Sequence, residues 1–220
     1  NPEERRYLTF FVRGDTYNLF GIAKGNLHLF GVEKGKLHIL GTDDLGRDVF
    51  SRTLYGTGTS MWIGIFGVLI AFVLALIIGG IAGYLGGWID FLIQRATEII
   101  RVVPVIPLFM GLAAAFPKDW SNVEVYFAMT IVLGLLGWPT LARRIRGHLL
   151  SERYEDYVLS AELSGASGRR VITKHLLPSF TSYIIVDVVI TFPYTILSET
   201  ALSFVGLGLR PPSISWGILL

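Results

Sequence analysis

The sequence contains no cysteine, so neither a disulfide bond nor a thiolate metal site can form within it. Charged residues are also scarce, at 16% of the 220 residues, against about a quarter in an average soluble domain. The four histidines are scattered, and neither a His-Glu-x-x-His nor a Gly-x-Ser-x-Gly motif occurs. These absences argue against an enzyme, and a net charge of only +2 argues against a nucleic-acid-binding protein.

Apolar residues dominate what is there, at 52% of the chain, with a mean hydropathy of +0.56 and 25 glycines. Residues 61–89 include no charged residue, and about 20 apolar residues suffice to cross a bilayer core. Further candidate spans cover residues 91–116, 123–142 and 182–204. Because lipid offers no hydrogen-bond partners to the backbone, all four should be helical. The predicted fold is therefore an all-α polytopic membrane protein with four transmembrane helices in this sequence.

The loop between the third and fourth spans is long and basic, with seven Arg and Lys residues between Arg143 and Ser179. The positive-inside rule places it in the cytoplasm and the N-terminal residues outside. A further span should precede Asn1 and another should begin near Leu219, which makes six in the whole protein. The expected segments are residues 1–58, external with an interfacial helix; 59–142, transmembrane; 143–180, cytoplasmic; 181–206, transmembrane; and 207–220, an external loop leading to a further helix.

Within the external segment, short apolar runs that end in glycine recur at a ten-residue spacing, at residues 18–21, 28–31 and 38–41. This pattern predicts a small β-meander. His28 and His38 could then meet on neighbouring strands and bind a metal, although two ordinary surface histidines are the better interpretation, and we predict no metal site. Residues 43–52 have the pattern of an N-capped helix start and suit a helix that lies in the membrane interface.

Ionisable groups inside a span are costly and usually face protein or water. Asp187 and Glu199 both fall in the last span, and each either lines a solute path or forms an interhelical pair, the interpretation we favour. The candidate partners are Arg95 or Arg101 for Asp187, and Arg52 or Arg210 for Glu199. The first span is rich in glycine, including Gly79 and Gly83 at GxxxG spacing, which predicts close packing against neighbouring helices.

The basic loop itself has helical spacing over residues 154–164, a natural stop at Gly165, and a second helical stretch over 168–177 before Pro178. Two short helices at the cytoplasmic surface suit docking on a partner protein. An amphipathic hairpin lying on acidic lipid explains the same pattern. The residues alone leave these two interpretations open.

Residues 157–179 resemble the EAA loop of bacterial ABC importer permeases. Ala161, Gly165, Leu177 and Pro178 fall at the family's spacing. Leu159 stands where the family usually has Glu, and Ser160 where it has the first Ala of the motif. An acidic neighbour then has to supply the contact that the missing Glu makes, and the candidates are Glu155, Asp156 and Glu162.

Two further stretches, residues 40–52 and 197–217, are similar to the dipeptide/oligopeptide branch of these permeases, in its second-permease type. The resemblance implies an ABC type I importer fold and a loop that couples the permease to an ATPase. The coupling residues that it implies are Tyr157, Leu159, Ser160, Ala161, Glu162, Gly165, Ala166, Ser167, His175, Leu177 and Pro178.

The same resemblance implies a homologous second permease, two ABC ATPase subunits and an external solute-binding protein as partners, in a bacterial or archaeal cytoplasmic (inner) membrane. The chain itself should bind no cofactor, with ATP and Mg on the ATPases, and it lacks the Gly-x-x-x-x-Gly-Lys-Ser/Thr phosphate loop. The implied solute is a peptide, with an oligosaccharide as the alternative. An ion-coupled secondary transporter that uses Asp187 and Glu199 is the competing class, and it leaves the EAA-like loop unexplained.

Overall fold

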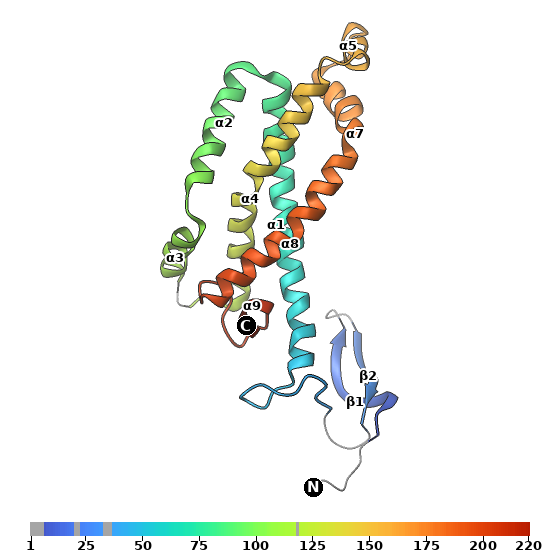
Figure 1. Ribbon diagram of the computed structural model, residues 1–220, viewed down its shortest axis with the longest axis vertical. Helices are drawn as coiled ribbons and strands as arrows, with labels where there is room; N and C mark the ends of the chain where they lie inside the picture. Colours follow the sequence, from blue (N-terminus) through green and yellow to red (C-terminus); the bar gives the residue numbers. More distant parts are fainter. Residues whose placement is uncertain (1–6, 20–22, 33–36, 118) are drawn as a thin grey trace. The chain divides into compact units, whose positions relative to one another are not determined.

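The computed structural model describes residues 7–19, 23–32, 37–117 and 119–220. The chain divides into two compact units, Asn1–Arg52 and Thr53–Leu220. The first carries the strands and the second nearly all of the helices (Figure 1).

The N-terminal unit contains one antiparallel hairpin, made of β1 (Thr9–Leu19) and β2 (Ala23–Gly31). The predicted third strand at residues 38–41 is wrong: these residues lead into a turn. The backbone N–H of Gly41 closes this turn by donating to the oxygen of His38 at 3.2 Å. Gly41 lies in the left-handed region, with φ of 78°, which favours a turn over a strand. A second turn follows, in which the carboxylate of Asp43 accepts hydrogen bonds from the backbone N–H groups of Leu45 and Arg47 at 3.0 and 2.9 Å.

The two histidines of this unit have separate partners. His28 Nε2 lies 2.9 Å from the backbone oxygen of Asp15, and His38 Nδ1 lies 3.2 Å from the carboxylate of Asp48. Among the described residues, no group of three His, Cys, Asp or Glu side chains is placed to hold a metal.

Helix α1 (Val49–Leu85) is a single helix of 37 residues. Asp48 caps its start, since its carboxylate accepts the backbone N–H of Ser51 at 2.8 Å. The helix start predicted within residues 43–52 is at Val49, and the helix continues without a break into the first predicted span. At 1.5 Å per residue α1 is about 55 Å long, well beyond a hydrocarbon core of about 30 Å.

The second predicted span is bent rather than straight. Helices α2 (Gly87–Val102) and α3 (Val105–Ala115) meet at 77°. Pro104 lies at the break and lacks a backbone donor, and Val103 before it is extended, as residues before proline prefer. Among the described residues, three helices can cross a membrane by length and composition, or four if this bent pair is one span.

Helix α4 (Asn122–Glu152) starts with a capping box formed by Ser121 and Glu124. It continues past the predicted end of the third span at residue 142, so the basic loop begins on the helix itself. Then follow α5 (Asp156–Leu163), α6 (Gly168–Arg170), a π-helical turn η1 (Val171–Leu176) and α7 (Leu177–Ser179), which leads into α8 (Thr181–Phe204). The two predicted helical stretches of the loop are confirmed. Helix α9 (Trp216–Leu219) ends the chain.

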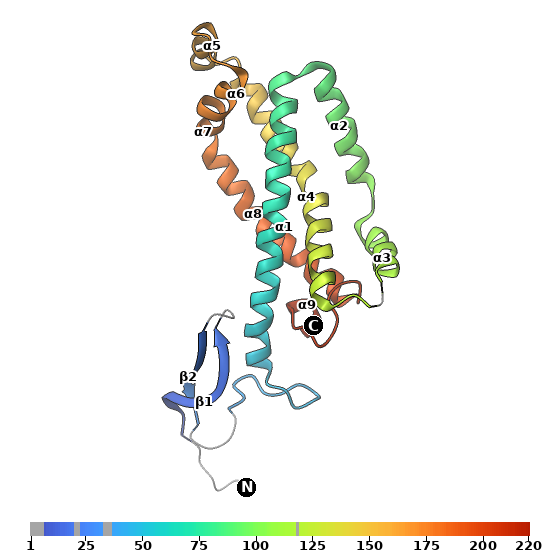
Figure 2. The ribbon, with the colours of Figure 1, turned by 180° about the vertical axis from the view of Figure 1, so that it is seen from behind.

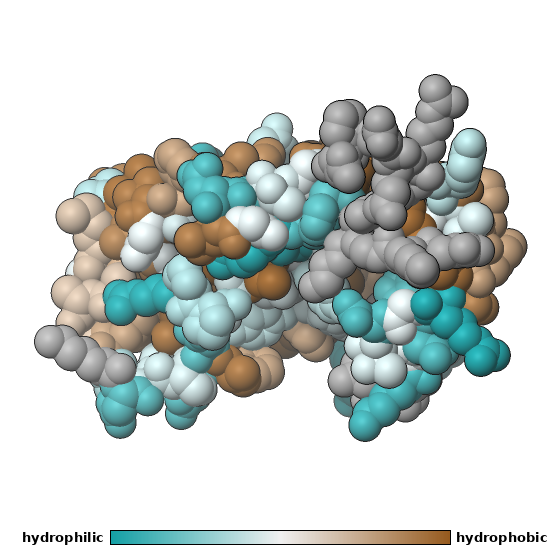
Figure 3. Space-filling view, turned by 90° about the horizontal axis from the view of Figure 1, so that it is seen from below, coloured by the Kyte–Doolittle hydropathy of each residue, from teal (hydrophilic) through white to brown (hydrophobic). Residues whose placement is uncertain are grey.

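Helices α1 and α4 run side by side in both ribbon views (Figures 1 and 2). Glycines of α1 allow this approach: a Cβ atom at Gly79 would lie 2.5 Å from the carbonyl oxygen of Ala142, and one at Gly83 would lie 2.7 Å from Cβ of Leu149. The predicted close packing of the glycine-rich span is confirmed. Hydrophobic residues also reach the surface beside hydrophilic ones (Figure 3), as expected where lipid or partner chains cover the helices.

Candidate functional site

The loop between α4 and α8 is firmly attached to the helical body. Val158 of α5, Val171 and Leu176 of η1, and Phe180 at the start of α8 are each 0% exposed. They share one hydrophobic cluster with Leu149 of α4 and with residues of α1. Burying four such side chains contributes several kcal/mol, at about 1.5–3 kcal/mol each. The loop and the ends of α1, α4 and α8 therefore form one packed body.

Polar contacts reinforce this attachment. The Tyr157 hydroxyl donates to the carboxylate of Glu152, at the end of α4, at 2.6 Å, and the Ser179 hydroxyl lies 2.5 Å from the same carboxylate. Partial burial raises the pKa of the Tyr157 phenol, and its hydrogen bond to Glu152 raises this pKa further. Tyr157 therefore remains a neutral donor at physiological pH. At the end of α1, the Tyr84 hydroxyl donates to Glu162 at 3.1 Å.

Gly165 ends α5 in the left-handed region, with φ of 82°. The backbone N–H of Gly165 donates to the oxygen of Glu162 at 2.9 Å, and that of Ala166 donates to the oxygen of Ala161 at 3.0 Å. This pair of bonds is the Schellman motif, which needs a residue without a Cβ penalty at the turn. The glycine that the sequence singled out therefore fixes the angle at which the second half of the loop leaves α5.

The other face of α5 is open. Leu163 is 90% exposed and Leu159 is 40% exposed, and Ser160 and Glu162 lie on the surface beside them. An aliphatic side chain as exposed as Leu163 gains nothing from its own fold. In the second half of the loop Ser167 and Pro178 are exposed, whereas Ala166, His175 and Leu177 are half-buried.

The predicted partners of Asp187 are wrong, although the predicted interhelical pair is present. Asp187 of α8 accepts a hydrogen bond from Nη1 of Arg144 of α4 at 2.6 Å, and neither Arg95 nor Arg101 contacts it. Arg95 instead pairs with Glu98 on its own helix at 2.5 Å. The Arg144 and Asp187 side chains are 45% and 21% exposed, so this pair lies at the surface of the chain.

Glu199 is 0% exposed, and among the described residues no basic side chain pairs with it, so the predicted pairing with Arg52 or Arg210 is wrong. Two hydroxyls take that role: Ser60 of α1 donates to Oε2 at 3.2 Å, and Ser203 of α8 donates to Oε1 at 2.7 Å. Each serine oxygen in turn accepts a backbone N–H, from Trp216 at 3.2 Å and from Leu209 at 3.3 Å. One carboxylate thereby fixes the segment between α8 and α9 through two serines.

One interhelical contact was missed from the sequence. Arg146 of α4 forms a two-pronged ion pair with Asp90 of α2, through Nε to Oδ1 and Nη2 to Oδ2. The signal was Asp90 itself, the first charged residue after the apolar run of residues 61–89. The pair connects α2 to α4 next to the loop.

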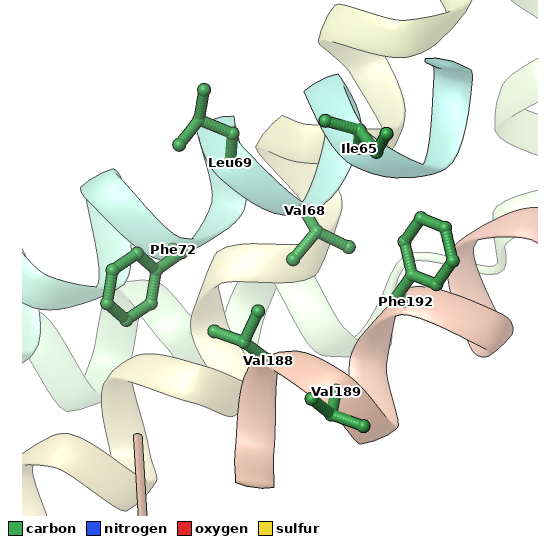
Figure 4. Close-up of a pocket in the computed structure, with 7 residues that line it drawn as sticks. All are labelled: Ile65, Val68, Leu69, Phe72, Val188, Val189 and Phe192. Carbon is green, nitrogen blue, oxygen red and sulfur yellow. The ribbon is translucent and has the colours of Figure 1, made fainter. Parts of the chain in front are cut away.

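An apolar pocket of about 360 Å³ lies between α1 and α8 (Figure 4). It has almost no polar lining, and no charged group points into it. Its walls are Ile65, Val68, Leu69 and Phe72 of α1 and Val188, Val189 and Phe192 of α8.

Comparison with known proteins now adds to this geometry. Residues 75–220 match the family described as binding-protein-dependent transport system inner membrane component. The chain is 38% identical over 178 residues to the dipeptide transport system permease protein DppC of Bacillus subtilis, which covers 81% of this chain and 54% of the relative. It is 35% identical over 178 residues to the oligopeptide transport system permease protein OppC of the same organism, with 81% and 56% covered. It is also 35% identical over 179 residues to OppC of Mycobacterium bovis, with 81% and 60% covered. The chain thus spans little more than half the length of these relatives.

Proposed function

Because the chain belongs to the family of binding-protein-dependent transport system inner membrane components, we propose that it is a permease subunit of an ATP-driven peptide importer. It forms half of a path through the membrane and obtains its driving force from separate ATPase subunits.

Family membership confirms the resemblance drawn from the sequence, the inner-membrane localisation and the helical membrane fold. It also makes the chain a transport component rather than a catalytic one, which agrees with the predicted absence of a catalytic centre and of a cofactor of its own. A binding protein as a partner is part of the family's description. The homologous second permease and the pair of ATPases belong to the proposal.

Peptides are the proposed solute class. The relatives in Bacillus subtilis and Mycobacterium bovis are named as dipeptide and oligopeptide permeases. The apolar pocket between α1 and α8 is lined by aliphatic and aromatic side chains and offers no hydrogen-bonding groups for the hydroxyls of an oligosaccharide. An oligosaccharide remains the alternative solute to be tested beside a peptide.

The geometry of α5 is the observation that carries the coupling role. Its inner face is anchored by Val158, and its outer face presents Leu163 and Leu159 next to a fixed glycine turn. The exposed Arg169, Arg170 and Lys174 of the same loop support the cytoplasmic side for it. We propose that Leu163 and Leu159 dock into the ATPase, with Glu162 and Asp156 at the polar rim of this contact.

A displacement of α5 would be transmitted to the membrane helices through the packed body formed by the loop and the ends of α1, α4 and α8. When the ATPases close, α5 is displaced with them. Because its buried contacts join it to α1, α4 and α8, these helices turn together rather than bending at the loop. Rigid-body rotation of this kind is a common way to switch between two states of a transporter.

Leu163→Asp tests the docking contact in the complete transport complex. The side chain is 90% exposed, so the substitution should leave the fold intact. An apolar anchor at an interface typically contributes about 2 kcal/mol, so we expect solute-stimulated ATP hydrolysis to fall by at least tenfold. Leu45→Asp is the matched control, since Leu45 is 72% exposed in the N-terminal unit.

Normal stimulated ATP hydrolysis in the Leu163→Asp complex, equal to that of Leu45→Asp, would contradict the proposal. Loss of binding to vesicles of anionic lipid, with unchanged hydrolysis, would favour a lipid-bound hairpin instead. Uptake that continues without ATP and stops when the ion gradient is removed would favour the ion-coupled class.

A further inference from the structure

Helix α8 is the span that the chain covers least. Within its most apolar window 11% of the residues are buried, against 39% in α1 and 44% in α4. Its buried residues, among them Ile196, Glu199 and Leu202, share an arc of about 120° at 100° per residue. The rest of the helix surface has to face lipid, a partner chain or water.

That open surface has two different sides. At 100° per residue, the apolar Val186, Val189 and Leu197 fall within an arc of about 80°, and all three are more than half exposed. A second arc, about 80° wide, is polar along the helix. We refer to it as the polar stripe of α8, and its residues are Tyr183, Asp187, Thr191, Tyr194 and Ser198.

Three residues of the polar stripe, Tyr183, Tyr194 and Ser198, are exposed, and the other two, Asp187 and Thr191, are half-buried. Tyr183 and Tyr194 are 60% and 66% exposed, and neither hydroxyl has a hydrogen-bond partner among the described residues. Tyr194 lies near the middle of the span, where an unpartnered hydroxyl in lipid is costly. The Arg144–Asp187 pair on the same side makes lipid contact costlier still, because charged groups are expensive to place in hydrocarbon. The stripe must therefore face water or polar partners.

Helix α4 extends this polar side towards the loop. The ring of His148 packs against that of Tyr183, with 4.6 Å between centroids and 34° between the ring planes. Arg144 lies one turn away from His148 and bonds to Asp187 through Nη1 alone. A guanidinium has five N–H donors, so most of the donors of Arg144 remain available at a side chain that is 45% exposed.

We propose that the polar stripe of α8, with Arg144, lines the solute path, and that Arg144 is a transient binding site for the carboxylate of the solute. This inference rests on the proposed function, because it requires a path. Asp187 holds the guanidinium of Arg144 towards the stripe. A carboxylate such as a peptide C-terminus can accept hydrogen bonds from the N–H groups of Arg144 that do not bond to Asp187. Since the site is half exposed, binding is weak enough for release, as transport demands.

Labelling of single cysteines in the assembled complex tests the lining. The sequence contains no cysteine, so each variant of this chain carries one reactive thiol. We expect Tyr194→Cys and Ser198→Cys to react with the membrane-impermeant methanethiosulfonate ethylsulfonate during ATP turnover. Val189→Cys and Leu197→Cys, on the apolar side at similar depth, are the matched controls and should react at least tenfold more slowly.

Equal reaction on the two sides, or faster reaction of the controls, would overturn the lining. The labelling result does not depend on which solute is transported. If the complex still hydrolyses ATP and still copurifies with its ATPases, such a result would overturn the lining but not the proposed function. A wild-type complex without ATPase partners would overturn the proposed function instead.

Uptake of trialanine and of trialanine amide by proteoliposomes tests the carboxylate site. For each solute the variant is compared with the wild type, so the preference of the binding protein cancels. Because exposed ion pairs contribute up to about 1 kcal/mol, Arg144→Gln should lower trialanine uptake at limiting solute by about fivefold. Uptake of the amide should change by less than twofold.

Arg143→Gln, an exposed neighbour on another side of α4, is the control and should affect both solutes alike. An equal loss for both solutes in Arg144→Gln would overturn the carboxylate site.

Discussion

Replacing Gly79 by alanine should force α1 and α4 apart. A Cβ atom at this position would lie 2.5 Å from the carbonyl oxygen of Ala142, 2.9 Å from its Cα and 3.1 Å from its carbonyl carbon. Non-bonded carbon atoms prefer about 3.5–4.0 Å. All three neighbours are backbone atoms, so no rotamer change can relieve the contact and the helices themselves have to move.

The cost can be estimated from overpacking in protein cores, which is typically about 1–3 kcal/mol. Gly80 provides a control one residue away, because nothing lies within 4 Å of its Cβ position. Gly80→Ala should be neutral or should stabilise the helix by up to about 1 kcal/mol. The two substitutions are chemically identical, so their difference reports the α1–α4 contact alone.

Thermal unfolding of the purified complex in detergent, followed by tryptophan fluorescence, measures this difference. At about 2–4 °C per kcal/mol for a chain of this size, Gly79→Ala should lower Tm by roughly 2–12 °C. Gly80→Ala should leave it unchanged or slightly higher. Equal Tm values for the two variants would refute the close approach of α1 and α4 at Ala142.

Two further predictions concern polar contacts. Glu199→Gln replaces one acceptor oxygen by a donor, so the hydroxyl of either Ser60 or Ser203 loses its acceptor and must turn its hydrogen away. At a cost of about 1–3 kcal/mol, Tm should fall and hydrogen exchange should speed up in the segment between α8 and α9, and an unchanged Tm with unchanged exchange would contradict the serine relay. For the Asp90–Arg146 pair, with side chains 14% and 26% exposed, a double-mutant cycle with Asp90→Asn and Arg146→Gln should give a coupling energy of about 1–2 kcal/mol in thermal stability, and additive effects would show that α2 is not held to α4 by this pair.

The membrane spans could be predicted because lipid imposes simple rules on sequence. Residues 61–89 lack charge, and such a run has few alternatives to a helix in a bilayer. The glycine spacing of Gly79 and Gly83 predicted close packing for an equally local reason. The bend between α2 and α3 was marked by Pro104, but its 77° angle is set by packing rather than by the sequence around it.

The partners of the polar groups could not be predicted from the sequence. Asp187 was matched to arginines by depth alone, whereas the pair with Arg144 depends on how α4 and α8 are rotated about their axes. For Glu199 a basic partner was expected, but its hydrogen-bond donors are Ser60 and Ser203. Nothing in the sequence distinguishes Ser60 from the other serines of the chain. Ser203 could have been found, because it lies one helical turn after Glu199.

The β-meander illustrates a different failure. The ten-residue repeat predicted a third strand at residues 38–41, but these residues form a turn instead, closed by the hydrogen bond from the backbone N–H of Gly41 to the oxygen of His38. The loop helices were predicted well, since Gly165 is a helix stop by its own conformation.

Crosslinking from position 163 tests the coupling role most directly. A cysteine in place of Leu163, in the full-length protein in native membranes, would carry a short photoactivatable crosslinker, and the products would be identified by mass spectrometry. The account predicts one dominant product, with an ATPase that contains a phosphate-binding loop, and loss of this product when Val158, which anchors α5, is replaced by Asp. Crosslinks to lipid alone, from a complex that still imports peptide with ATP, would contradict it.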